Sequence, residues 1–140
     1  MTARRRTALA HLALGAPAEA RVLAAEEVAL AQAFHGAGTL GIALRAAGLA
    51  EGGSRGIELL RQAVNVLEDS GARLEHARAM ADLGAALRRA GHRAESRETL
   101  RRALDLAHRC GAFALTERAR TELVAAGGRP RGSSSAGSTR

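Results

Sequence analysis

An internal repeat constrains this chain more than any other feature of its sequence. The segment LGIALRAAG, residues 40–48, recurs in register 43 residues later as LGAALRRAG, residues 83–91. The segment LRQAVNVLEDSGA, residues 60–72, recurs 40 residues later as LRRALDLAHRCGA, residues 100–112. A third copy begins in RARTELVAAG, residues 118–127. Two segments per copy and a period near 40 are typical of a helical solenoid, in which each copy packs on its neighbours.

The spacing of apolar residues within each copy predicts helices. In residues 93–110 one helical face carries only small and apolar positions, and the opposite face is charged. Ala, Leu, Arg and Glu are strong helix formers and dominate the chain, whereas it holds two Phe, no Trp and no Tyr for strands. The sequence therefore predicts an all-α chain with about seven antiparallel helices, near 5–14, 17–34, 38–47, 55–70, 72–90, 93–110 and 112–126.

The glycines have two predicted roles. Six glycines follow a predicted helix, where a left-handed C-cap favours a residue without a side chain; these are Gly15, Gly48, Gly71, Gly91, Gly111 and Gly127. Gly41 and Gly84 instead lie inside predicted helices, where glycine costs about 1 kcal/mol relative to alanine. We expect a second helix to approach the backbone closely at these two positions.

The stretch GAGTLG, residues 36–41, matches the G-x-G-x-x-G pattern of dinucleotide-binding loops. That pattern acts as a phosphate cradle only between a strand and a helix. The preceding residues 22–34, VLAAEEVALAQAF, have no strand character. We therefore interpret GAGTLG as the start of a helix.

The formal charge of +7 is concentrated at the ends of the chain. Of the 21 basic residues, 15 remain in the central part against 14 acids once six terminal arginines are set aside: Arg4, Arg5, Arg6, Arg129, Arg131 and Arg140. Terminal charge supports non-specific attraction to polyanions. Direct nucleic-acid binding through these arginines is one hypothesis, and it requires an affinity that falls steeply with salt.

No catalytic or metal-binding pattern is present in the sequence. The five histidines form no i, i+4 pair, and Cys110 is the single cysteine, so it can form no intramolecular disulfide. No nucleophile stands in a triad or elbow pattern. The N-terminal stretch has some marks of a secretory signal, but its apolar part contains His11, and no run is long enough to span a membrane. We expect a cytoplasmic protein that is not an enzyme and binds no cofactor or metal.

The second copy resembles a tetratricopeptide repeat. The positions that define the tetratricopeptide signature are occupied here by Met80, Leu83, Gly84, Leu87, Ser96, Leu100, Ala103 and His108. Met and Leu stand where that family usually has aromatic residues, and the spacing exceeds its standard period of 34. The resemblance implies a tetratricopeptide-like α-solenoid. Its packing positions would include Leu40, Gly41, Leu44, Leu60, Met80, Leu83, Gly84, Leu87, Leu100, Ala103 and Leu104.

A resemblance to the helical-repeat region of large ATP-binding regulators of the LuxR family extends over residues 7–131. It is carried by GIALRAAGLAEGG, by GIELLRQAVNVLEDSGARLEHARAMADLGAALRRAGHRAESRETLRRALDLAHRCGA and by ERARTELVAAGGRPR. In that family a P-loop ATPase precedes the repeats and a DNA-binding helix-turn-helix follows them. This chain contains no lysine and hence no P-loop motif, and after Arg131 it reads GSSSAGSTR. The resemblance therefore implies a fragment, with ATP and DNA bound only by the parent's other domains.

The domain organisation that follows is a basic end (1–6), a repeat domain (7–127) and a Gly/Ser/Arg tail (128–140). The function implied is an interaction or sensor segment that binds a protein or peptide partner, or self-associates. The alternative is a free-standing tetratricopeptide-type adaptor unrelated to transcription.

The arginines have two interpretations. Those on residues 88–102 form a solvated helical face, with Glu98 and Arg102 as an i, i+4 pair. In the tetratricopeptide pattern, arginines on the first helices would instead line a groove and hold an acidic partner segment. These groove candidates are Arg45, Arg78, Arg88, Arg89 and Arg118.

Overall fold

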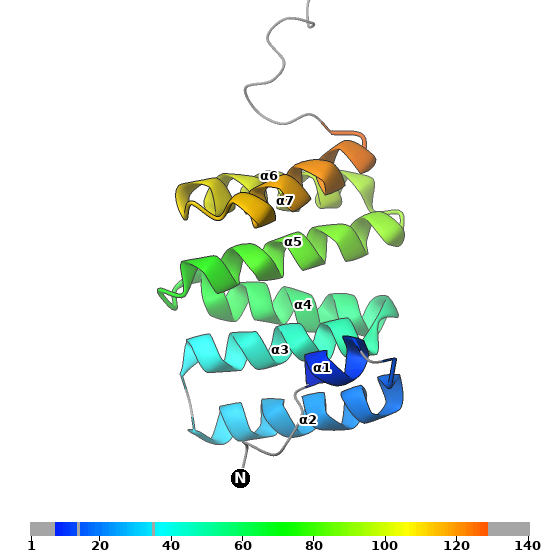
Figure 1. The fold of residues 1–140 in the computed structure, drawn as a ribbon, viewed down its shortest axis with the longest axis vertical. Helices are drawn as coiled ribbons and strands as arrows, with labels where there is room; N and C mark the ends of the chain where they lie inside the picture. The colour runs from blue at the N-terminus through cyan, green and yellow to red at the C-terminus, as the bar shows by residue number, and fades with distance from the viewer. Residues whose placement is uncertain (1–7, 14, 35, 129–140) are drawn as a thin grey trace, which may run out of the picture. The chain divides into compact units, whose positions relative to one another are not determined.

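All regular structure in the described part of the chain is helical. The computed structural model describes residues 8–13, 15–34 and 36–128. Its helices are α1 Ala8–Ala13, α2 Pro17–Phe34, α3 Ala37–Glu51, α4 Gly53–Glu68, α5 Arg73–Arg89, α6 Arg93–Arg109 and α7 Phe113–Ala125 (Figure 1). The all-α prediction is confirmed, and α2, α5, α6 and α7 have nearly the expected bounds. None of these helices is long and apolar enough to cross a membrane.

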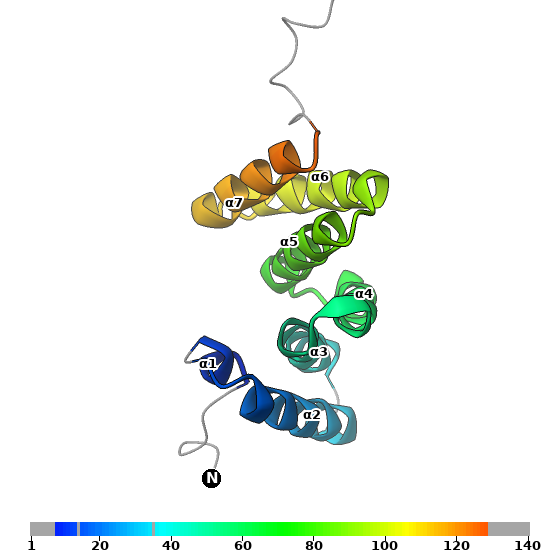
Figure 2. The same cartoon turned by 90° about the vertical axis from the view of Figure 1, so that its right-hand side faces the viewer.

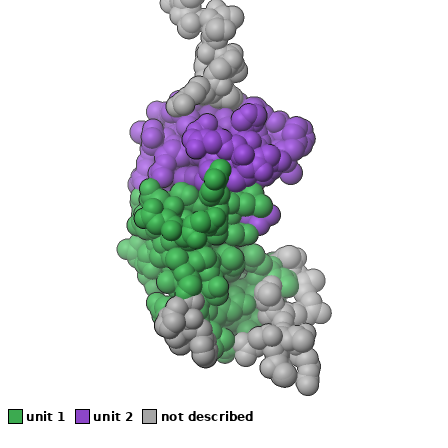
Figure 3. Space-filling view, turned by 90° about the vertical axis from the view of Figure 1, so that its left-hand side faces the viewer, with its two compact units in different colours: residues 1–76 green, residues 77–140 purple. Residues whose placement is uncertain are grey.

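The chain forms two compact units, residues 1–76 and residues 77–140 (Figure 3). Unit 1 holds α1 to α4 and the first turn of α5. Unit 2 holds the rest of α5 with α6 and α7. The boundary falls inside the continuous helix α5.

Unit 1 is built around a tight helical hairpin of α3 and α4, which lie side by side (Figure 1). A single residue, Gly52, joins them with a φ of 70°, and its N–H donates to the carbonyl of Gly48 at 3.0 Å. The predicted C-cap at Gly48 is therefore wrong, because α3 continues to Glu51. Gly48 is buried in the hairpin, where a Cβ would lie 2.8 Å from Leu60 Cγ and 2.9 Å from the carbonyl oxygen of Gly56.

The expected close approach at Gly41 is present in unit 1. A Cβ at Gly41 would lie 2.2 Å from Cγ of Leu67, which is 1% exposed. Real Cβ atoms do not come this close, so the isobutyl group of Leu67 occupies the space that the missing side chain leaves. The glycine costs helix propensity and allows α4 to pack directly on the backbone of α3.

Alanines form most of the remaining core of unit 1. Helix α2 begins at Pro17, where proline is compatible with the first helical turn. Helix α1 lies against α2 and α3 (Figure 2). Their shared core consists of Ala8, Ala20, Ala24, Ala46, Ala47 and Ala50, with Leu9, Leu12, Leu23, Val28 and Leu59 packed against it.

Unit 2 has a contact of the same kind between a glycine and a leucine, at a different place in the repeat. A Cβ at Gly84 in α5 would lie 2.4 Å from Cγ of Leu100 in α6, and Leu100 is fully buried. Ser96 adds a buried hydrogen bond, donating from Oγ to the Gly84 carbonyl at 2.8 Å. Helices α4 and α6 bury matching positions 40 residues apart: Leu60, Ala63, Val64 and Leu67 in α4, and Leu100, Ala103, Leu104 and Ala107 in α6.

The other predicted C-caps have the backbone conformation that favours glycine. The φ angles are 79° at Gly15, 83° at Gly71, 88° at Gly91, 72° at Gly111 and 86° at Gly127. Each of these residues follows a helix end. The sequence pattern therefore predicted the positions of these turns. The predicted C-cap that is wrong is Gly48, close to the single residue, Gly52, that joins α3 to α4.

Candidate functional site

Three of the five predicted groove arginines form ion pairs with acids on neighbouring helices. In unit 1, Arg45 Nη1 lies 4.0 Å from Glu75 Oε1. In unit 2, Arg88 Nε lies 3.0 Å from Glu122 Oε1. Arg118 Nη1 lies 2.7 Å from Asp82 Oδ1. These guanidinium groups connect α3 to α5 and α5 to α7.

The pair of Arg118 with Asp82 contains the most buried carboxylate of the three pairs. Asp82 is 3% exposed, whereas the side chain of Arg118 is 42% exposed. A carboxylate at that depth requires a charged partner or several hydrogen bonds. Arg118 therefore stabilises the α5–α7 contact, in addition to any role in binding a partner. Of the remaining candidates, Arg78 is half-buried and Arg89 is exposed.

The packing positions predicted from the repeat are buried with one exception. Leu40 is half-buried at the start of α3. The others lie in the core of their own unit: Gly41, Leu44, Leu60, Met80, Leu83, Gly84, Leu87, Leu100, Ala103 and Leu104.

Unit 1 contains a hollow of about 530 Å³ between α2, α3 and α4. Its floor is made of alanines with Val28 and Leu59, and its charged groups pair with acids nearby. Arg21 Nε lies 3.9 Å from Glu51 Oε1, and Arg55 Nη1 lies 3.2 Å from Glu58 Oε1. The rim of this hollow therefore has little net charge to attract a ligand.

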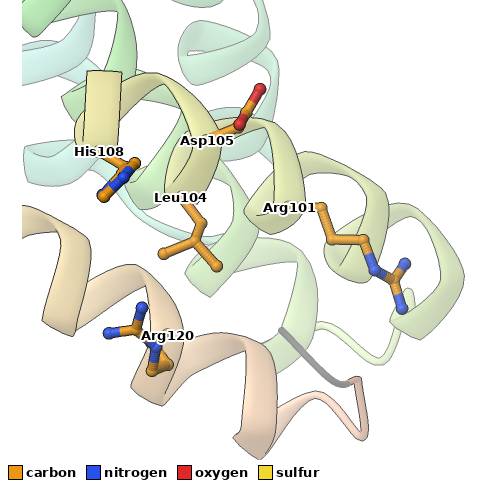
Figure 4. Close-up of a pocket in the computed structure, with 5 residues that line it drawn as sticks. All are labelled: Arg101, Leu104, Asp105, His108 and Arg120. Atoms are coloured by element: carbon orange, nitrogen blue, oxygen red, sulfur yellow. The ribbon is translucent and has the colours of Figure 1, made fainter. Parts of the chain in front are cut away.

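A smaller pocket of about 290 Å³ lies between α6 and α7 in unit 2 (Figure 4). Leu104 forms its apolar floor and is 8% exposed. Arg101, Asp105 and His108 line it from α6, and Arg120 lines it from α7. These residues lie together because positions 101, 104 and 108 share one face of α6, the face that packs against α7.

The charges of this pocket are not balanced. Arg101 and His108 have no side-chain hydrogen bond or ion pair to any residue that the structure describes. Asp105 accepts from Arg109 Nη2 at 2.7 Å and points away from α7 in Figure 4. Arg120 pairs with Glu117 on its own helix. The pocket therefore presents an apolar floor flanked by guanidinium and imidazole groups.

The sequence pattern did not predict this pocket. Arg101 belonged to the face interpreted as solvated, yet it is half-buried beside Leu104. The expected pair of Glu98 with Arg102 does not form within the described residues, where the i, i+4 pair on α6 is Arg109 with Asp105. The available signal was the order Arg101, Leu104, His108, which alternates charged and apolar groups along one helical stripe.

Comparison with known proteins identifies no family for this chain. The chain matches no protein-family model, no curated protein and no solved structure. Among residues 8–13, 15–34 and 36–128, no three His, Cys, Asp or Glu side chains come together as a metal site would require.

Proposed function

We propose that this chain is a non-enzymatic helical-repeat module that binds a protein or peptide partner. The observation that supports this most is a type of helix contact found in both units, although the two leucines hold different repeat positions, since Leu67 matches Ala107 and not Leu100. A glycine within one helix receives a leucine from the next, at Gly41 with Leu67 and at Gly84 with Leu100. Repeated hairpins of this kind form tetratricopeptide-like solenoids, whose extended surfaces serve mainly for binding other chains.

The resemblance to the LuxR-family regulators supports a more specific proposal. The chain would be the helical-repeat segment of such a regulator and would receive a partner or effector in the cytoplasm. Chemistry on ATP and contact with DNA would belong to that family's P-loop and helix-turn-helix domains. The 140 residues of this chain contain no P-loop motif. The proposed role in partner binding requires neither ATP nor DNA.

The alternative is a free-standing adaptor of the tetratricopeptide type. The repeat geometry supports both proposals equally, because it concerns only how the hairpins pack. Genomic sequence on both sides of the reading frame, translated in all frames, separates them. A P-loop upstream and a helix-turn-helix downstream are expected for the regulator, and unrelated flanking genes would favour the adaptor.

Partner binding is tested by proximity labelling in the cells that carry this chain. Binding of the labelled proteins to the purified chain is then measured directly. A labelling enzyme fused to the polypeptide that contains these repeats should mark a small, reproducible set of proteins. At least one of them, or a second copy of the chain, should bind the purified chain directly. Failure of every candidate to bind, with the chain monomeric in sedimentation at all accessible concentrations, would contradict the proposal.

A further inference from the structure

The pocket between α6 and α7 has a chemistry that suits one kind of occupant. We infer that it receives an acidic segment of a partner protein, in which an apolar side chain is flanked by carboxylates. This inference rests on the proposed interaction function and identifies the site and the partner's chemistry. The apolar side chain would contact Leu104, and the carboxylates would meet Arg101 on one side and Arg120 with His108 on the other.

The charges around the pocket favour an acidic occupant. Arg101 is half-buried and has no partner in the described part of the chain, so its guanidinium is available to a ligand. Guanidinium binds carboxylate through paired N–H donors, which gives direction as well as attraction. Asp105, the acid in the lining, is already engaged by Arg109 at 2.7 Å and is turned away from α7 (Figure 4).

The arrangement of these groups favours a peptide over a small anion. Figure 4 shows Arg101 on one side of Leu104, and Arg120 with His108 on the other. An occupant that meets both cationic ends must therefore extend past an apolar floor. The volume of about 290 Å³ lies at the lower limit for small-molecule pockets but accommodates one or two side chains.

The same lining argues against nucleic acid. Single-stranded nucleic acid is typically held by aromatic rings that stack on its bases, and the pocket has no Phe, Tyr or Trp. Stable duplex binding uses on the order of 6–10 phosphate contacts, whereas this pocket offers two guanidinium groups. The apolar surface of Leu104 would gain nothing from a phosphate backbone.

The site also differs from the one expected from the repeat pattern. Arg45, Arg88 and Arg118 are engaged by acids of this chain, so a carboxylate from a partner would have to displace an internal one. Arg101 requires no such displacement, and Arg120 would exchange only its exposed pair with Glu117 on the same helix. The acidic partner is therefore assigned to the α6–α7 surface of unit 2.

Fluorescence anisotropy with a labelled peptide made of Glu, Leu and Gly tests this assignment. Arg101→Gln and Arg120→Gln should each weaken binding about tenfold, as expected for loss of a charge-assisted hydrogen bond. Arg102→Gln is the matched control, because Arg102 is exposed on the same helix, carries the same charge and does not line the pocket. It should weaken binding less than about twofold. Thermal melts would verify that all three variants are folded.

Three results of the anisotropy measurements would overturn the site. The first is an equal loss of affinity in Arg102→Gln and the pocket variants, which would mean attraction to net charge only. The second is unchanged binding when Gln replaces Glu in the peptide. The third is tighter binding of a mixed-sequence single-stranded DNA than of the peptide. A partner found by proximity labelling that binds Arg101→Gln and Arg120→Gln as tightly as the wild type would reject this site and leave the interaction function standing.

Discussion

At the scale of single residues, two helix-interior glycines account for how the hairpins close. The sequence predicted this at Gly41 and Gly84 because a glycine inside a strong helix pattern needs a packing reason. It could not identify the leucines that fill the space, since Leu67 and Leu100 come from the next helix and their register depends on the turn between. Gly48 was misassigned for the same reason: only the three-dimensional turn at Gly52 shows that α3 continues past it.

Replacing Gly84 by alanine should destabilise unit 2. The new Cβ would lie 2.4 Å from Leu100 Cγ, and the resulting overpacking costs about 1–3 kcal/mol, more than the gain of about 1 kcal/mol in helix propensity. Gly38→Ala in α3 is the matched control, because its nearest contact would be Ala72 Cβ at 3.8 Å. Urea unfolding should show a loss for Gly84→Ala and no loss for Gly38→Ala. Stabilisation of both to the same extent would contradict the close approach.

At the scale of elements, the amphipathic pattern of α6 predicted its buried face correctly. It did not predict that α7 packs beside the residues next to that face. Ser96, Leu100, Ala103 and Leu104 are buried as their spacing requires. Arg101 was assigned to solvent, because periodicity within one helix does not reveal that α7 packs beside it. The α6–α7 pocket arises from that packing and therefore could not be found from spacing within one helix.

Leu100→Ala should lower the free energy of unfolding by about 2–5 kcal/mol, since the side chain is fully buried and a cavity would remain. Val124→Ala in α7 is the comparison, because Val124 is 58% exposed and its truncation should change stability by less than about 0.5 kcal/mol. Chemical denaturation of both variants measures the difference. A loss below about 1 kcal/mol for Leu100→Ala would show that the assigned face of α6 is wrong.

The ion pair between α5 and α7 should contribute more than an exposed pair. Arg118→Gln removes a partner of Asp82, which is 3% exposed, and should cost about 1–3 kcal/mol. Arg109→Gln breaks the exposed pair with Asp105 and should cost less than about 0.5 kcal/mol. Unfolding in low salt measures both free energies. Equal, small losses of unfolding free energy in the two variants would mean that Arg118 does not stabilise the buried carboxylate of Asp82.

At the scale of the whole molecule, we propose that this chain is a series of helical hairpins held together by contacts between neighbours. In such an array stability is approximately a sum of local terms, and a damaged hairpin can open without its distant neighbours. A domain with one cooperative core would instead transmit the damage to every helix. The repeat in the sequence favours the first behaviour, and the proposed interaction function depends on it.

Native-state hydrogen exchange of the wild type and Leu100→Ala tests this claim most directly. In Leu100→Ala, backbone amides of α6 and α7 should exchange faster, with the amides of α2 and α3 changed much less. An equal increase in exchange across α2 to α7, corresponding to one common loss of unfolding free energy, would contradict it.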